Sequence, residues 1–168
     1  MTVKQLYLAR HAKSAWDTEA LNDFSRPLSK RGIKDIKRMG KKLAELEWNP
    51  QLILCSPAQR TRQTCDLLYQ YALLEGDIEY KDELYVARTS ALVKLLADTP
   101  ETTGSVMIIA HNPAIEWLLL DLCNDVPAQA NGKIVATTNI AKINFQGSWN
   151  NLQRGSGELV DLLRPKEI

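Results

Sequence analysis

The two histidines of this chain each follow a short apolar run, and this placement constrains the fold more than any other feature. His11 follows residues 6–10 (LYLAR), and His111 follows residues 106–110 (VMIIA). Such runs predict buried parallel strands, and ligands of open α/β sheets bind at the carboxyl ends of their strands. Because histidine has a pKa near neutrality, two histidines at that edge suit nucleophilic and proton-transfer chemistry. The alternative is a pair of hydrogen-bonded histidines that serve only the packing of the strand ends.

The composition places the chain among ordinary globular proteins. Its 168 residues, 45% of them hydrophobic, are enough for one domain with a substantial core. A net charge of +1 gives no general electrostatic basis for binding nucleic acid or a membrane surface. No apolar stretch reaches the roughly 18 residues of a spanning helix, and the first residues lack the apolar core of a signal peptide. The cysteines Cys55, Cys65 and Cys123 are odd in number and widely spaced, which favours reduced thiols and predicts a soluble, cytoplasmic protein.

Strand-like and helix-like patterns alternate along the chain. Strands are predicted at residues 3–9, 52–55, 78–80 and 105–110, and helices at 29–46, 57–72, 89–96 and 113–123. The last section predicts two or three antiparallel strands, at residues 140–145, 149–152 and 159–163. Repeated strand–helix units of this kind predict a three-layer α/β/α fold, with a mainly parallel sheet, helices on both faces and an antiparallel C-terminal end.

Several positions carry more specific predictions. Ser29 and Ser56 are the expected N-caps of the helices that follow them. Trp117, in the apolar helix after the strongest strand, is expected in the core rather than in a groove for a partner. The polar segment 13–27 is too long for a simple turn, so we expect it to cover another part of the molecule.

Two arginines accompany the histidines at the predicted sheet edge. Arg10 directly precedes His11, and Arg60 lies in the first turns of the helix after the second strand. A helix N-terminus favours anions, and a guanidinium presents a planar, permanently charged fork that matches phosphate oxygens. Arg60 alone could be a solvated residue like its neighbour Arg62. Its convergence with Arg10 and both histidines predicts a pocket for a phosphoryl group.

Four motifs occur in order along the chain: Arg10-His11-Ala12, Arg26-Pro27-Leu28-Ser29 with Gly32, Ser56-Pro57 with Arg60 and Gln63-Thr64, and His111-Asn112-Pro113. Together they resemble the motifs of the histidine phosphatase superfamily, and the chain is most similar to the short SixA-like phosphohistidine phosphatases. The resemblance covers almost the whole chain. It implies a phosphoglycerate mutase-like fold and a single histidine phosphatase domain over residues 1–168.

The resemblance also implies a role for each residue at the sheet edge. His11 would attack phosphorus and become a transient phosphohistidine, while Arg10, Arg60 and His111 would hold the phosphoryl oxygens. Glu83, after the third strand, is the candidate general acid, with a plain surface carboxylate as the alternative. No metal or other cofactor is implied, because the positive charge of the site is built into the protein.

Two positions depart from the pattern of the family. Ala12 replaces the usual glycine after the Arg-His pair, which is tolerated if the backbone there keeps a negative φ. Asp17 stands where many relatives carry asparagine. Because a carboxylate repels a phosphate, we expect Asp17 to orient Arg10 or Lys13 instead.

The preferred function is therefore a phosphatase that forms a covalent phosphohistidine on His11 and acts on phosphohistidine, in a protein substrate. The short segment 13–27 and the lack of a cap insertion favour a site open to a protein surface. The alternatives are a small-molecule phosphomonoesterase of the same superfamily and a non-catalytic phosphate-binding regulatory module. A phosphorylated substrate is the expected partner, without nucleic acid or membrane; a monomer is favoured, and the oligomeric state is left open.

Overall fold

The computed structural model describes residues 2–20 and 22–168, so Leu21, in the segment predicted to cover another part of the molecule, lies outside the described part. The strands are β1 (Val3–Arg10), β2 (Leu52–Cys55), β3 (Asp77–Tyr80), β4 (Ser105–Ala110), β5 (Ile140–Gln146) and β6 (Glu158–Leu163). The α-helices are α1 (Lys30–Glu45), α2 (Gln59–Tyr71), α3 (Thr89–Ala97) and α4 (Ala114–Leu122). Short 3-10 helices are η1 (Asp82–Leu84), η2 (Trp149–Asn151) and η3 (Pro165–Glu167).

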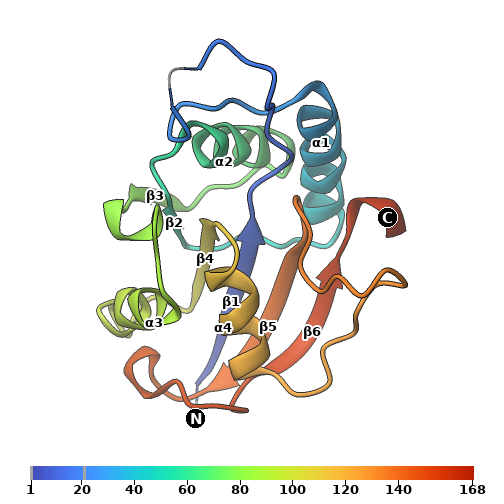
Figure 1. Cartoon of the computed structure of the whole chain (residues 1–168). Helices are drawn as coiled ribbons and strands as arrows, with labels where there is room; N and C mark the ends of the chain where they lie inside the picture. Colours follow the sequence, from blue (N-terminus) through green and yellow to red (C-terminus); the bar gives the residue numbers. More distant parts are fainter. Residues whose placement is uncertain (1, 21) are drawn as a thin grey trace.

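The strands form one six-stranded sheet in the order β3-β2-β4-β1-β5-β6 (Figure 1). Strands β3, β2, β4 and β1 pair in parallel, whereas β5 runs antiparallel to both β1 and β6. This arrangement confirms the predicted α/β class, with a mainly parallel sheet and an antiparallel C-terminal end. None of the helices in the described part of the chain is long and apolar enough to cross a membrane.

Two hydrophobic cores lie on opposite faces of the sheet, because successive residues of a strand point to opposite sides. On one face, Leu6 and Leu8 of β1 pack in the cluster that contains the apolar residues of α3 and α4. On the other face, Tyr7 and Ala9 pack in the cluster formed with α1 and α2. Helices therefore cover both faces of the sheet (Figure 1), as the sequence predicts.

Helix α1 begins where the sequence predicts, and its first turn is fixed to the backbone that follows β1. The hydroxyl of Ser29 accepts a hydrogen bond from the backbone N–H of Gly32 at 3.0 Å, so Ser29 is the N-cap. The same hydroxyl donates to the carbonyl of Lys13 at 3.0 Å. A Cβ at Gly32 would clash with that carbonyl oxygen, so the close approach of α1 to the backbone near His11 requires glycine.

Three local predictions are wrong. Ser56 does not cap α2, because the helix starts at Gln59 after Ala58 and has no side-chain cap. Trp117 is 55% exposed, since the apolar residues of α4 extend beyond the face that packs on the sheet. The predicted strand at 149–152 is instead the 3-10 helix η2, in which Trp149 is buried and stacks edge-on against Phe145.

Candidate active site

Three neighbouring strands bring the predicted site residues to one edge of the sheet. Arg10 is the last residue of β1, and His11 follows it; His111 follows β4, the adjacent parallel strand. The sheet hydrogen bonding continues beyond the strand, because the His11 N–H donates to the carbonyl of Ala110 at 3.1 Å. As a result, the two imidazole rings lie 5.2 Å apart between centroids. The structure thus confirms that the carboxyl ends of β1 and β4 meet, which the sequence pattern predicts.

The ring of His11 has a defined tautomer and orientation. Its Nδ1 lies 2.7 Å from the carbonyl oxygen of Ala12, and because a carbonyl can only accept, Nδ1 must carry the proton. The lone pair is therefore on Nε2. Burial lowers the pKa of His11 to about 3, and the neighbouring charges of Arg10 and Arg60 act in the same direction. The imidazole is consequently neutral at pH 7, which is the form that can act as a nucleophile.

Arg10 is held by a main-chain carbonyl. Its Nη1 donates to the carbonyl of Val135 at 3.1 Å, while its buried Nε has no hydrogen-bond partner in the described part of the chain. Burial lowers the pKa of Arg10, although the nearby carboxylate of Glu116 opposes this effect. The guanidinium remains charged at neutral pH, since arginine does not deprotonate in proteins.

His111 is oriented by Ser56, the residue that directly follows β2. The His111 Nε2 lies 2.8 Å from the Ser56 hydroxyl, so this serine contacts a site histidine and does not cap α2. The buried Nδ1 of His111 has no hydrogen-bond partner among the described residues. Burial lowers the pKa of His111 to about 4, helped by the charge of Arg60 and opposed by the charge of Asp23.

Arg60 reaches the site from the first turn of α2 and is 6% exposed. Its Nη1 donates to the backbone carbonyl of Asp23 at 2.8 Å, and its Nη2 lies 3.1 Å from the Asp23 carboxylate. The Nε of Arg60 is buried without a partner in the described part of the chain. Arg60 is therefore a buried residue of the site and not the solvated arginine that was its alternative.

The site also contains Asp23, a carboxylate that the sequence analysis did not single out. It accepts hydrogen bonds from the hydroxyl of Tyr85 at 2.7 Å and from Arg26 at 3.2 Å, besides the pair with Arg60. The Tyr85 hydrogen bond is the main reason that the pKa of Asp23 falls to about 2, and Arg60 adds to this effect. Asp23 lies three residues before Arg26 in a recognised motif, but its partner Arg60 is distant in sequence, so spacing alone could not have found it.

Two aromatic residues, Tyr85 and Phe24, pack beside His111. The Tyr85 ring stands edge-on to His111, with centroids 5.8 Å apart, and the Phe24 ring lies 4.9 Å from Tyr85. Phe24 belongs to the segment 13–27, and its carbonyl accepts from the N–H of Gln59 at the start of α2. This part of the segment therefore packs beside the site, in agreement with the prediction that it covers something.

Thr64 connects the backbone after His11 to the helix that carries Arg60. Its hydroxyl accepts from the N–H of Ala12 at 3.0 Å and donates to the carbonyl of Arg60 at 2.7 Å. The described non-glycine residues with a positive φ are Glu47, Leu73, Asp125 and Thr138, so Ala12 meets the condition under which alanine replaces glycine. These hydrogen bonds fix the backbone after His11 relative to helix α2.

The structure does not bring Glu83 to the other predicted residues. Glu83 is exposed and lines a separate hollow with Leu54, Lys81 and Leu95, whereas Tyr85 is the residue of this stretch that faces His111. Asp17 is exposed in the segment 13–27. Within residues 2–20 and 22–168, three or more His, Cys, Asp or Glu side chains nowhere cluster in a way that could hold a metal ion.

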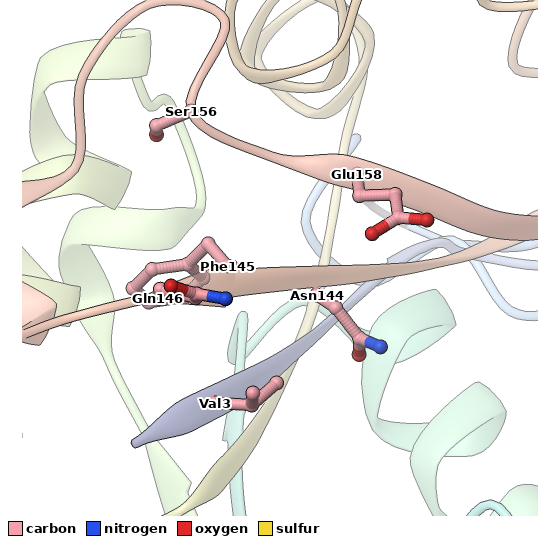
Figure 2. Close-up of a pocket in the computed structure, with 6 residues that line it drawn as sticks. All are labelled: Val3, Asn144, Phe145, Gln146, Ser156 and Glu158. Carbon is pink, nitrogen blue, oxygen red and sulfur yellow. The ribbon is translucent and has the colours of Figure 1, made fainter. Parts of the chain in front are cut away.

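Another hollow lies at the opposite end of β1 and has a different character. Its volume is about 380 Å³, and its lining is Val3, Asn144, Phe145, Gln146, Ser156 and Glu158 (Figure 2). The charged side chain in this lining is the carboxylate of Glu158, which repels anions. The hollow is therefore unsuited to a phosphoryl group, in contrast to the edge of the sheet that carries Arg10 and Arg60.

Comparison with known proteins defines the class to which this fold and site belong. The profile of the histidine phosphatase superfamily (branch 1) matches residues 6–85, a range that includes Arg10, His11 and Arg60. The chain is 31% identical to phosphohistidine phosphatase SixA of Escherichia coli over 121 residues, which are 71% of this chain and 74% of that protein. The chain belongs to the histidine phosphatase superfamily.

Other relatives extend the similarity over nearly the whole chain. A structure assigned as the phosphohistidine phosphatase SixA of Agrobacterium tumefaciens has a TM-score of 0.81 and 30% identity, covering 96% of this chain and 98% of that one. The protein histidine phosphatase SixA complexed with tungstate has a TM-score of 0.79 and 26% identity, covering 97% and 98%. An uncharacterised protein of Mycobacterium leprae is 28% identical over 94% of this chain and 99% of its own length. These similarities support phosphatase, and hence hydrolase, activity.

Proposed function

We propose that the protein hydrolyses phosphohistidine in a protein substrate through a covalent phosphohistidine on His11. The observation that carries this proposal is the neutral His11 with a free Nε2, which lies beside His111 at 5.2 Å between ring centroids. The charges of Arg10 and Arg60 are close enough to act on both imidazoles. Together these groups offer an oxyanion two guanidinium groups next to the nucleophile, and the SixA complex with tungstate supports such a ligand.

Each residue then has a defined part in the reaction. The Nε2 lone pair of His11 attacks phosphorus; a P–N bond to His11 forms as the bond to the leaving imidazole breaks, and that imidazole takes up a proton. Water then attacks the phosphohistidine, inorganic phosphate leaves, and His11 returns to its neutral form. Arg10 and Arg60 stabilise the charge on the phosphoryl oxygens in both steps.

His111 acts as a neutral hydrogen-bond donor in this proposal. The Ser56 hydroxyl accepts from the N–H of Ala58 at 3.4 Å, so its own proton is free to go to Nε2 of His111. That hydrogen bond leaves the proton of the imidazole on Nδ1, the atom without a partner. Ser56 is thus a positioning residue that fixes the tautomer of His111.

Rapid-quench labelling tests the nucleophile. Wild type, His11→Ala and His111→Gln are mixed with a radiolabelled phosphohistidine peptide and quenched in base. We expect an acid-labile, base-stable phosphoenzyme in wild type, slower labelling in His111→Gln, and none in His11→Ala, whose thermal unfolding confirms that it is folded. Labelled His11→Ala would exclude His11 as the nucleophile.

The same experiment separates the substrate classes. Turnover of p-nitrophenyl phosphate without turnover of the peptide would assign the protein to the small-molecule phosphomonoesterases. Absence of label and turnover with both substrates, together with tight binding of orthovanadate, would assign it to the phosphate-binding modules.

A further inference from the structure

A cationic hollow lies next to the candidate active site, and we call it the basic cleft. Its volume is about 140 Å³, and its walls come from the backbone after His11, the first turns of α1, the loop 129–139 and the end of β6. The cationic residues of its lining are Lys13, Arg31, Lys133, Arg164 and Lys166. Among the lining residues that the structure describes, only Asp35 is acidic. The whole chain has a net charge of +1, so this concentration of cations is a local feature.

Most of the positive charge of the basic cleft is not neutralised by the protein. Asp35 pairs with Arg31 at 3.6 Å, while Lys13, Lys133 and Lys166 make no ion pair within 4.0 Å of any described residue. Neighbouring like charges raise the local potential for an anion.

Arg164 places a further cation in the wall of the basic cleft, although it is only 4% exposed. Its Nη2 donates to the carbonyls of Pro127 and Ile134, so one of its roles is to hold the loop that carries Lys133. Its ion pair with the half-exposed Glu167 is long, at 3.7 Å, and its buried Nε has no partner in the described chain. The weak pairing with Glu167 leaves the charge of Arg164 only partly compensated.

The basic cleft is close to His11, both in sequence and through a backbone hydrogen bond. Lys13 is two residues from His11, and Thr137 and Asn139 of the lining flank Thr138, whose N–H donates to the His11 carbonyl at 3.1 Å. A phosphoryl group on His11 and an anion in the basic cleft can therefore belong to one molecule. The hollow of Figure 2, which contains a carboxylate and no cation, lacks this character.

We propose that the basic cleft is a second oxyanion subsite, which binds a carboxylate or phosphoryl group of the same substrate whose phosphoryl group is transferred to His11. This inference rests on the proposed function and narrows its substrate class to molecules with an acidic group next to the phosphorylated one. In a protein substrate, aspartate or glutamate near the phosphohistidine has this chemistry. In a small molecule, a second phosphate group has the same chemistry.

Two pairs of substrates test the subsite and distinguish these sources. One pair is a phosphohistidine peptide flanked by glutamates and the same peptide flanked by glutamines. The other pair is a hexose bisphosphate and the matching hexose monophosphate. Each is measured with wild type, with the cleft variant Lys133→Glu/Lys166→Glu, and with the control variant Lys41→Glu/Lys94→Glu, which makes the same charge change outside the cleft lining. Fluorescence anisotropy of the labelled peptides gives a second readout that does not need turnover.

We expect wild type and the control variant to prefer the acidic member of at least one pair by about tenfold in kcat/KM at low salt, since surface charge contacts are screened as salt rises. The cleft variant should lose this preference, so that its kcat/KM becomes equal for the two members of the pair. A preference confined to the peptides identifies carboxylates, and one confined to the hexoses identifies a second phosphate.

Equal preference in the cleft and control variants, or none in wild type by either readout, would overturn the subsite while leaving the phosphohistidine mechanism intact. A wild type that turns over neither the glutamate nor the glutamine peptide would instead refute the proposed function. The anisotropy measurement would still decide whether the cleft binds acidic groups.

Discussion

Main-chain carbonyls, and not compensating carboxylates, hold most of the side chains of the site. Ala12 accepts from the ring of His11, Val135 accepts from Arg10, and the backbone of Asp23 accepts from Arg60. A neutral carbonyl orients a cation without cancelling its charge. The positive potential therefore remains available to an anionic substrate, and the Asp23 carboxylate is the exception that pairs directly with Arg60.

At the scale of the residue, Arg60→Lys tests the value of a planar guanidinium. Lysine keeps the charge but cannot reproduce the fork whose two terminal nitrogens bond Asp23. We expect turnover to fall about a hundredfold, as for the loss of one oriented donor. The matched control is Arg62→Lys on the same helix, where the guanidinium stacks on the exposed Tyr80 at 4.0 Å.

Steady-state kinetics and the inhibition constant of orthovanadate measure the effect. In Arg60→Lys, turnover should fall and the inhibition constant of orthovanadate should rise. In Arg62→Lys, both quantities should stay within about twofold of wild type. Equal losses in the two variants would show that α2 contributes general charge rather than a specific ligand.

At the scale of the element, Gly32→Ala tests the contact of α1 with the backbone after His11. Alanine favours a helix over glycine by about 1 kcal/mol, so propensity alone predicts stabilisation. The structure predicts the opposite, because the new Cβ would clash with the carbonyl of Lys13. We expect a loss of about 2 kcal/mol in the free energy of unfolding, measured by urea denaturation.

Gly104→Ala is the control for that measurement. A Cβ there would lie 3.5 Å from the end of the flexible Gln51 side chain, an ordinary contact. Its free energy of unfolding should therefore change by less than about 1 kcal/mol. A stabilised Gly32→Ala would mean that α1 can move away from Lys13 at little cost.

Whole elements were easier to predict from sequence than the details at their ends. The buried strands and the amphipathic face of α1 repeat a simple period, so β2 and β4 were predicted with their observed bounds. Ser56 has the residue type of an N-cap but bonds His111 instead, a long-range partner that no local pattern contains. For the same reason Asp23 was missed, and Glu83 was chosen by its position in the chain although it lines another hollow. Trp117 lies on an apolar helix, and only the packed structure shows which side of that helix meets the sheet.

At the scale of the whole molecule, the two buried histidines make stability depend on pH. Their native pKa values, about 3 and about 4, lie below the ordinary value of about 6.5 that they recover on unfolding. The unfolded chain therefore binds more protons between these values, and stability falls as pH decreases through this window. The slope is at most about 1.4 kcal/mol per histidine for each pH unit below about 6.

Urea denaturation of wild type and His11→Gln/His111→Gln between pH 4.5 and pH 7.5 isolates this contribution, because the carboxylates are common to both proteins. As the pH falls, the free energy of unfolding should decrease more for wild type than for the variant. Above pH 7 the difference between the two proteins should be constant. Parallel pH profiles would show that the two histidines titrate in the native state with their ordinary pKa.

The pairing of β1 with β4 has a consequence for how proteins built like this one can diversify. Neighbouring strands of any sheet are about 4.8 Å apart, and here the rings of His11 and His111 are separated by 5.2 Å. The spacing of the two imidazoles is thus set by backbone hydrogen bonds, which substitutions of side chains hardly alter. The segment 13–27 and the loop 129–139 are outside this ladder. Evolution can therefore change the surroundings of the site by changing loops, while the two histidines stay where the sheet puts them.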